Sequence, residues 1–106
     1  MSLNLNMAHA AQALAALGHE ARLSVFRLLV RSGHDGINVG EISAHLDMPA
    51  STLAHHLRAL VTAGLVVQER HGRITINRAD FDAMDGLLAF LGDECCAGVK
   101  PATDAA

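Results

Sequence analysis

Two short apolar repeats with a break between them constrain the fold of this chain more than any other part of its sequence. The first repeat covers residues 41–46 and the second covers residues 50–63. Their apolar side chains recur three or four positions apart, at Ile42, Leu46, Leu53, Leu57 and Leu60. The intervening Asp47-Met48-Pro49 interrupts the helix, because a residue before proline avoids helical geometry, while proline suits the first turn of the next helix. Two short helices joined by so tight a turn are the signature of a helix-turn-helix.

Two longer helices and a very short strand are predicted before this motif. The first helix has a stripe of apolar or small side chains at Leu3, Met7, Ala10, Leu14 and Leu17, and Gly18 interrupts it. The second covers about residues 19–31 and ends near Gly33, a plausible C-cap. Its inward side chains are expected to be Ala21, Val25, Leu28 and Leu29. Residues 37–39 are predicted to form the very short strand.

A hairpin and a last helix are predicted after the motif. Residues 65–70 and 73–77 are two β-rich runs, and His71-Gly72 between them favours a turn. The last helix is expected from about residue 79 to at least residue 94. Its apolar stripe is Phe81, Met84, Leu88, Leu91 and Cys95.

The expected fold class is mainly α with a small β-hairpin wing (α+β), a dimeric winged helix-turn-helix. One domain is expected over residues 1–98, with a flexible tail over residues 99–106. The composition is 51% hydrophobic but only 3% aromatic, which suits closely packed helices. A mean hydropathy of +0.27 indicates that some apolar surface is buried between the subunits of a homodimer. A loosely packed, alanine-rich monomer would give the same value. The apolar first and last helices are the natural dimer surface.

The distribution of charge favours nucleic acid as a partner, although the net charge is −3. Residues 51–78 carry a formal balance of +3, from Arg58, Arg70, Arg73 and Arg78 against Glu69. Residues 79–106 carry −5. A basic middle beside an acidic end is what one phosphate-binding face would need. An ordinary solvated surface would give the same pattern.

The sequence also predicts where the protein resides and what it does not do. No segment approaches the ~18 to 20 uninterrupted apolar residues of a membrane span, so no membrane association is expected. Two adjacent cysteines cannot staple a secreted domain, and free thiols fit a reducing compartment, so the cytoplasm is expected. No glycine-rich phosphate loop and no recognisable Ser/His/Asp set is present, and an enzyme is not expected.

Two runs of residues resemble the signatures of one known family. The run Leu17-Gly18-His19-Glu20-Ala21-Arg22-Leu23, continued by Val25-Phe26-Arg27-Leu28-Leu29, looks like the opening of ArsR-type (ArsR/SmtB) repressors. The run Ser51-Thr52-Leu53-Ala54-His55-His56-Leu57-Arg58-Ala59-Leu60, continued by Ala63-Gly64-Leu65-Val66, is similar to their recognition helix and its exit. The resemblance covers roughly residues 12–92. It implies a winged-helix repressor that dimerises through its first and last helices, binds a palindromic double-stranded operator and releases it when an inducer binds.

The residues themselves support DNA binding. A helix buried along Leu53, Leu57 and Leu60 turns other side chains toward the major groove, namely Ser51, Thr52, His55 and Arg58. Ser51 and Thr52 could instead cap backbone amides in the first turn, and His56 is expected to brace the helix against its neighbours. The hairpin tip offers Arg70, His71 and Arg73, which a basic wing uses to hold phosphate or the minor groove. A merely solvated hairpin is the alternative.

The cysteine pair Cys95-Cys96 is the candidate sensing site. Two neighbouring thiols at a helix end can close around a soft, thiophilic centre. The pair resembles the arsenic-responsive subgroup of ArsR-type repressors, which implies a trivalent arsenic or antimony species as inducer, such as arsenite, antimonite or methylarsenite, with no cofactor required. Some relatives carry a third cysteine a few residues further on, and none follows Cys96 here. Two thiolates suit an arsenical whose third position already holds carbon.

Other interpretations of the cysteines and of the domain stay open. Cys95 could simply continue the apolar stripe of the last helix. The same repressor could sense oxidants or reactive sulfur through its thiols, or the winged helix could serve as a protein-interaction module. Two metal sites of other relatives are not expected: Asn38-Val39-Gly40 stands where a Cys-Val-Cys motif would be, and the last helix has no histidine for zinc.

Overall fold

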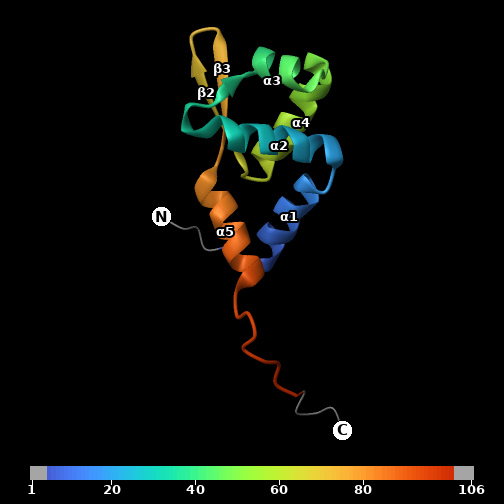
Figure 1. Cartoon of the computed structure of the whole chain (residues 1–106), viewed down its shortest axis with the longest axis vertical. Helices are drawn as coiled ribbons and strands as arrows, with labels where there is room; N and C mark the ends of the chain where they lie inside the picture. The colour runs from blue at the N-terminus through green and yellow to red at the C-terminus, as the bar shows by residue number, and fades with distance from the viewer. Residues whose placement is uncertain (1–4, 102–106) are drawn as a thin grey trace.

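The computed structural model describes residues 5–101 of the chain, which contain five α-helices and a small sheet. The helices are α1 (Met7–Leu17), α2 (Glu20–Ser32), α3 (Val39–Leu46), α4 (Ala50–Thr62) and α5 (Phe81–Gly92). The strands are β1 (Ile37–Asn38), β2 (Val66–His71) and β3 (Ile74–Ala79), and a short 3-10 helix, η1 (Gly33–Asp35), joins α2 to β1. This order confirms the mainly helical α+β class (Figure 1). None of the helices in this range has the length and apolar content needed to cross a bilayer.

The helix-turn-helix is built from α3 and α4. Helix α3 begins two residues earlier than predicted because Asn38 and Glu41 form a capping box: the Asn38 side chain accepts from the Glu41 amide at 2.8 Å, and the Asn38 amide donates to the Glu41 carboxylate at 2.9 Å. Asp47 ends α3 in the left-handed region, with φ at 49°. The Ser43 hydroxyl donates to the Met48 carbonyl at 2.6 Å, which ties the turn back to α3. Pro49 then precedes α4 as its N-cap.

The core lies where α2, α3 and α4 meet the sheet. Most of the predicted inward residues of these helices are buried, namely Val25, Leu28, Leu29, Ile42, Leu53, Leu57 and Leu60, while Ala21 and Leu46 are only half-buried. They recur at helical spacing, so each helix presents a single apolar side to the others. This packing fixes which side of α4 remains outside.

The sheet has the order β1-β3-β2, and both pairings are antiparallel. His71 pairs with Ile74, so the hairpin turn is Gly72-Arg73, one residue later than predicted. Gly72 has a φ of 64°, which suits the first position of a two-residue hairpin turn. Asn77 of β3 is fully buried, and its amide accepts from Gln68 at 2.8 Å and donates to the Ile37 carbonyl at 3.3 Å. Asn77 thereby ties all three strands together.

Helices α1 and α5 form an arm at the end opposite the hairpin tip (Figure 1). The predicted stripe of α1 is partly wrong, since its buried residues are Ala10, Ala13 and Ala16, while Met7 is 73% and Leu14 is 41% exposed. The stripe of α5 is also partly wrong, because the helix buries Ala83 and Leu87 and leaves Leu88 and Leu91 exposed. Leu3, which was assigned to the first stripe, lies outside the described residues. The arm therefore keeps an open apolar side.

Helix α5 ends at Gly92, two residues before the predicted minimum. Turns follow at residues 93–96, where Glu94 and Cys96 adopt positive φ angles of 60° and 62°. Cys95 is exposed and lies outside the helix, so it does not continue an apolar stripe. Residues 97–101 have no regular structure, and the rest of the expected tail, residues 102–106, lies outside the described range.

Candidate nucleic-acid interface and cysteine pair

The outer side of α4 carries the four predicted contact residues. Leu53, Leu57 and Leu60 hold one side of this helix in the core, which leaves the opposite side to solvent. Ser51, Thr52, His55 and Arg58 are all exposed there. The structure therefore brings the four side chains to one helix face, as the apolar spacing predicts.

Arg58 occupies the middle of this face. Two hollows flank it, one of about 320 Å³ beside α1 and one of about 250 Å³ beside the hairpin. Within residues 5–101 its guanidinium has no hydrogen bond or ion pair. An unpaired guanidinium on an exposed helix can bind a phosphate or a guanine edge through two parallel hydrogen bonds.

The hydroxyls of Ser51 and Thr52 do not cap α4. The N-cap residue is Pro49, and no side chain accepts a hydrogen bond from the first turn of the helix. Both hydroxyls therefore remain available to an outside partner. The alternative prediction, in which these residues serve as caps, does not hold for this helix.

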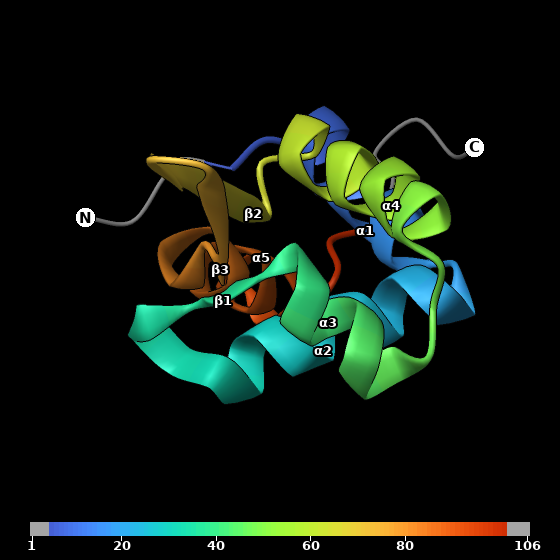
Figure 2. The ribbon, with the colours of Figure 1, turned by 90° about the horizontal axis from the view of Figure 1, so that it is seen from above.

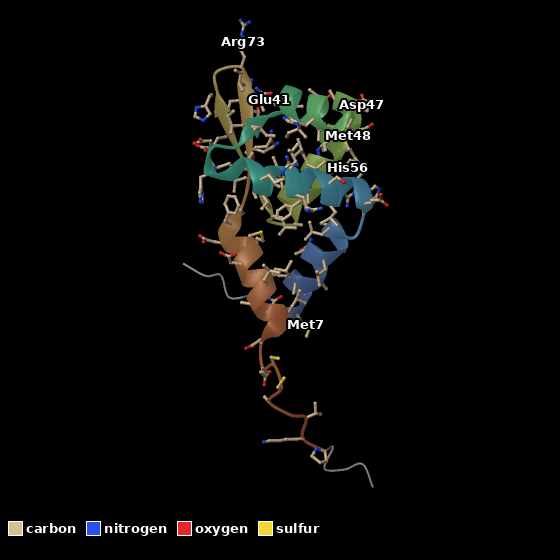
Figure 3. The ribbon with its side chains drawn as sticks, in the orientation of Figure 1. Met7, Glu41, Asp47, Met48, His56 and Arg73 are labelled. Atoms are coloured by element: carbon tan, nitrogen blue, oxygen red, sulfur yellow. The ribbon has the colours of Figure 1, made fainter. Side chains whose placement is uncertain are left out.

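The three predicted wing residues differ in how free they are. Arg70 donates from Nε to the Gly72 carbonyl at 2.9 Å, which braces the turn. The His71 imidazole lies 4.0 Å from the Glu69 carboxylate. Arg73 projects from the tip of the hairpin (Figure 3). Arg73 is therefore the wing side chain best placed to reach a partner.

One basic residue of the middle segment is not part of this surface. Arg78 is half-buried and pairs with Glu69 across the hairpin. The pair is neutral, so the balance of +3 over residues 51–78 comes from Arg58, Arg70 and Arg73. Sequence spacing alone does not reveal the pairing, because it depends on the register of two strands.

The wing and α4 border the same side of the molecule. Seen from above, the hairpin and α4 stand next to each other along the edge opposite α2 (Figure 2). The hollow between them is lined by Ala54, Arg58 and Val61 of α4 and by Gln68 of β2. Thr62 of α4 also lines this hollow. Thr62 and Gln68 therefore flank Arg58, although neither was predicted as a contact.

His56 lies on the inner side of α4, as predicted. It is 6% exposed, and its ring centre is 5.0 Å from that of His19, the N-cap residue of α2. Arg22 of α2 donates from Nε to His56 Nδ1 at 3.5 Å. Burial, and then the positive potentials of His19, Arg22 and His55, hold the pKa of the His56 imidazole below its ordinary value.

The two cysteines lie in the turns after α5. Both are exposed, and their Sγ atoms are 3.3 Å apart. The Cys95 amide donates to the Gly92 carbonyl at 3.1 Å, and the Ala97 amide donates to the Glu94 carbonyl at 3.0 Å, so backbone bonds hold the turn on both sides. Among the described residues, no group of three or more His, Cys, Asp or Glu side chains is arranged to hold a metal ion. One protomer supplies two thiols and no clustered third donor from residues 5–101.

Comparison with known proteins agrees with this architecture. The model of a helix-turn-helix domain family matches residues 17–69. An uncharacterized HTH-type transcriptional regulator of Bacillus subtilis, YbzH, is 33% identical over 91 residues, which cover 74% of this chain and 91% of YbzH.

Solved structures show the same fold. An ArsR-like transcriptional regulator from Rhodococcus sp. RHA1 is 27% identical, with a TM-score of 0.70 and coverage of 79% of this chain and 76% of that one. The winged helix-turn-helix domain of Mb0332 from Mycobacterium bovis is described as homodimeric and as a possible ArsR-family regulator. It is 23% identical, with a TM-score of 0.64 and coverage of 96% and 100%. The chain belongs to the ArsR family of winged helix-turn-helix transcriptional regulators.

Proposed function

We propose that this protein is a homodimeric repressor that binds a palindromic operator and is released from it by a thiol-reactive inducer. One observation carries the DNA-binding part. The outer side of α4, with Arg58 unpaired among the described residues, borders the same side of the molecule as the wing. A helix of this kind fits the major groove, while the Arg73 tip reaches the adjacent backbone or minor groove.

The exposed apolar side of the arm supports the dimer. Met7 and Leu14 of α1 and Leu88 and Leu91 of α5 are 41–73% exposed in one protomer, and covering them removes apolar surface from water. One domain makes few phosphate contacts, so it binds weakly alone. A dyad between two arms would place two copies of α4 about 34 Å apart, one turn of DNA.

The geometry of the thiols supports a soft inducer. If each sulfur lies about 2.3 Å from a bound centre, as in zinc thiolates, sulfurs 3.3 Å apart subtend about 92° at that centre. This angle is narrower than a tetrahedral one and suits a three-coordinate, pyramidal centre. Trivalent arsenic and antimony form such thiolate complexes, so a trivalent arsenical is the inducer we propose.

The number of thiols supports one kind of arsenical above the others. Cys95 and Cys96 supply two sulfurs, and the described residues cluster no third ligand with them. Methylarsenite brings its own carbon in the third position and needs two thiolates alone. Arsenite or antimonite would need hydroxide, an external thiol or a group from the second protomer.

Release would follow from the position of the cysteines at the end of the arm. An inducer weakens DNA binding only as far as it prefers the arrangement that cannot bind DNA. A 100-fold loss of operator affinity corresponds to about 2.7 kcal/mol of such coupling. Closing the turn after α5 around an arsenical would change how the two arms pack, and with it the spacing of the two α4 helices.

A second signal is favoured by the same observation. The Cys95 and Cys96 sulfurs are exposed and in contact, so oxidants or reactive sulfur could modify them. Release by an oxidant would require disulfides between subunits, because adjacent cysteines form only a strained disulfide. Release by reactive sulfur would instead proceed by transfer of a sulfur atom to a thiol, which gives a persulfide.

The test is fluorescence anisotropy on the DNA upstream of the protein's own gene. The complex is titrated with methylarsenite, arsenite, zinc and peroxide, for the wild type and for Cys95→Ser and Cys96→Ser. We expect methylarsenite to release the wild type and neither variant. Release of both variants to the same extent would overturn the arsenical site, release by peroxide alone would assign the second signal, and absence of any DNA binding would favour a protein-interaction module.

A further inference from the structure

The contact between Arg22 and His56 joins α2, the helix that follows the arm helix α1, to α4, which carries the candidate DNA-binding side. Gly18 ends α1, and His19, the next residue, packs its ring on His56 of α4. Arg22, one turn further along α2, donates from Nε to Nδ1 of the same ring at 3.5 Å. Figure 3 shows His56 between α2 and α4. The His56 ring therefore links the junction of α1 and α2 to α4.

The direction of the hydrogen bond determines the state of the ring. Arginine has no acceptor, so the Arg22–His56 contact is a hydrogen bond only when Nδ1 carries the lone pair and the proton lies on Nε2. If Nδ1 took up a proton, its N–H would point at the Nε–H of Arg22 and the hydrogen bond would be lost. The imidazolium of His56 would also lie next to the guanidinium of Arg22. In the described part of the chain, no carboxylate is among the groups that act on the ring. These groups are His19, the N-cap of α2, Arg22 of α2 and His55 of α4 itself.

We propose that His56 is a positioning residue of the recognition helix: its neutral ring, held by Arg22, keeps α4 in the orientation that binds the operator, and operator affinity falls when the ring takes up a proton. The proposal rests on DNA binding through α4. It adds a dependence on pH that has no connection with the thiols, since Cys95 and Cys96 lie beyond the other end of the arm.

His56→Asn is the variant that distinguishes the effect of a neutral side chain at this position from the effect of a protonated one. The amide oxygen of asparagine can occupy the position of Nδ1 and accept from Arg22, and it cannot be protonated in this pH range. Operator affinity is measured by anisotropy from about pH 7.5 to about pH 5.5, where histidine titrates. The ratio of the two dissociation constants at each pH cancels the effects of pH that the two proteins share.

We expect the two proteins to bind the operator within about twofold of each other at the upper pH. The dissociation constant of the wild type should then rise about fivefold relative to His56→Asn on acidification, the effect of losing one hydrogen bond. A ratio that stays constant over the whole range would overturn the positioning role. Absence of wild-type binding at every pH would overturn the proposed function itself, and with it the effect on affinity.

Two further measurements keep the proposal testable if His56→Asn does not fold. Nitrogen-15 spectra of the free wild-type protein should show the His56 proton on Nε2 at about pH 7.5, and a proton on Nδ1 would contradict the contact. Arg22→Lys keeps the positive charge but loses the Nε donor. It should bind the operator about fivefold more weakly at that pH and respond less to acidification; wild-type affinity with wild-type pH dependence would count against the proposal.

Discussion

Gly36 shows how a single residue fixes the path of the chain into the sheet. Its φ is 70°, and a Cβ at this position would lie 2.6 Å from the Asn77 carbonyl oxygen. Asn77 is the buried residue that links the three strands. A side chain at Gly36 would therefore push on backbone that cannot move without opening the β1–β3 pairing.

Gly36→Ala should destabilise the fold more than a matched substitution at Gly33. Gly33 has a similar backbone conformation, with φ of 72° and ψ of −159°, but nothing within 4 Å of where a Cβ would lie, so Gly33→Ala adds only the backbone strain that both positions share. Gly36→Ala adds the clash to this strain and should cost about 1–3 kcal/mol more than Gly33→Ala. Urea unfolding of both variants measures the difference, and equal midpoints would show that the contact with Asn77 is unimportant.

The stability of the free protein should also depend on His56. Its pKa is lowered in the folded state, so the unfolded chain binds more protons as the pH falls below about 6.5, the ordinary value for histidine. The free energy of unfolding of the wild type should therefore decrease relative to His56→Asn from about pH 7.5 to about pH 5.5. Urea titrations at these two pH values measure the free energy of unfolding. A wild type that gains stability on acidification relative to the variant would contradict a lowered pKa of His56 in the folded protein.

At the scale of elements, the helix-turn-helix could be predicted well and the arm less well. Leu53, Leu57 and Leu60 specify both the helix and its inner side, because local spacing and burial agree there. The start of α3 at Val39 could also be predicted from the sequence, since Asn38 and Glu41 have the spacing of a capping box.

The stripe of α5 misleads for a physical reason. Leu88 and Leu91 repeat like core residues, yet they are 60% and 56% exposed in one protomer. An apolar stripe does not say whether it faces the same chain or a second one. The Arg22–His56 contact was out of reach for a different reason, because its partners are 34 residues apart and meet only through tertiary packing.

Leu88→Glu should separate the two protomers if the arm is the dimer surface. A charge buried in an apolar interface destabilises it strongly, so sedimentation should give a mass near the 11.1 kDa of one chain and operator binding should weaken. Ile74→Glu is the matched control for the mass, because Ile74 is 50% exposed but lies on the wing and away from the arm. A dimer that survives Leu88→Glu would remove the arm from the interface.

The wing makes a separate prediction. Arg73 extends from the hairpin tip (Figure 3), where a contact to phosphate positions the protein without reading sequence. Arg73→Ala should weaken binding to operator and to unrelated DNA by a similar factor and reduce the salt slope by about 1. Anisotropy at several salt concentrations measures both quantities, and a loss confined to the operator would indicate direct reading of bases instead.

The described part of the molecule is elongated, with principal extents of 62 × 27 × 19 Å. The α4 face and the wing occupy one end, and the cysteine pair follows the arm at the other (Figure 1). The proposed DNA-binding side and the proposed sensing site therefore lie at opposite ends of one protomer. In the proposed mechanism, an inducer at the thiols acts on the operator through the arm and the way two arms pack.

The central claim is that the outer side of α4 binds DNA, and one comparison tests it most directly. Arg58→Ala and Lys100→Ala each remove one positive charge, the first from α4 and the second from the exposed segment beyond α5. In an anisotropy titration of the upstream DNA at fixed salt, Arg58→Ala should raise the dissociation constant about tenfold or more, as loss of a contact of about 1–3 kcal/mol predicts. Lys100→Ala should leave it unchanged. Equal effects of the two substitutions would contradict the claim.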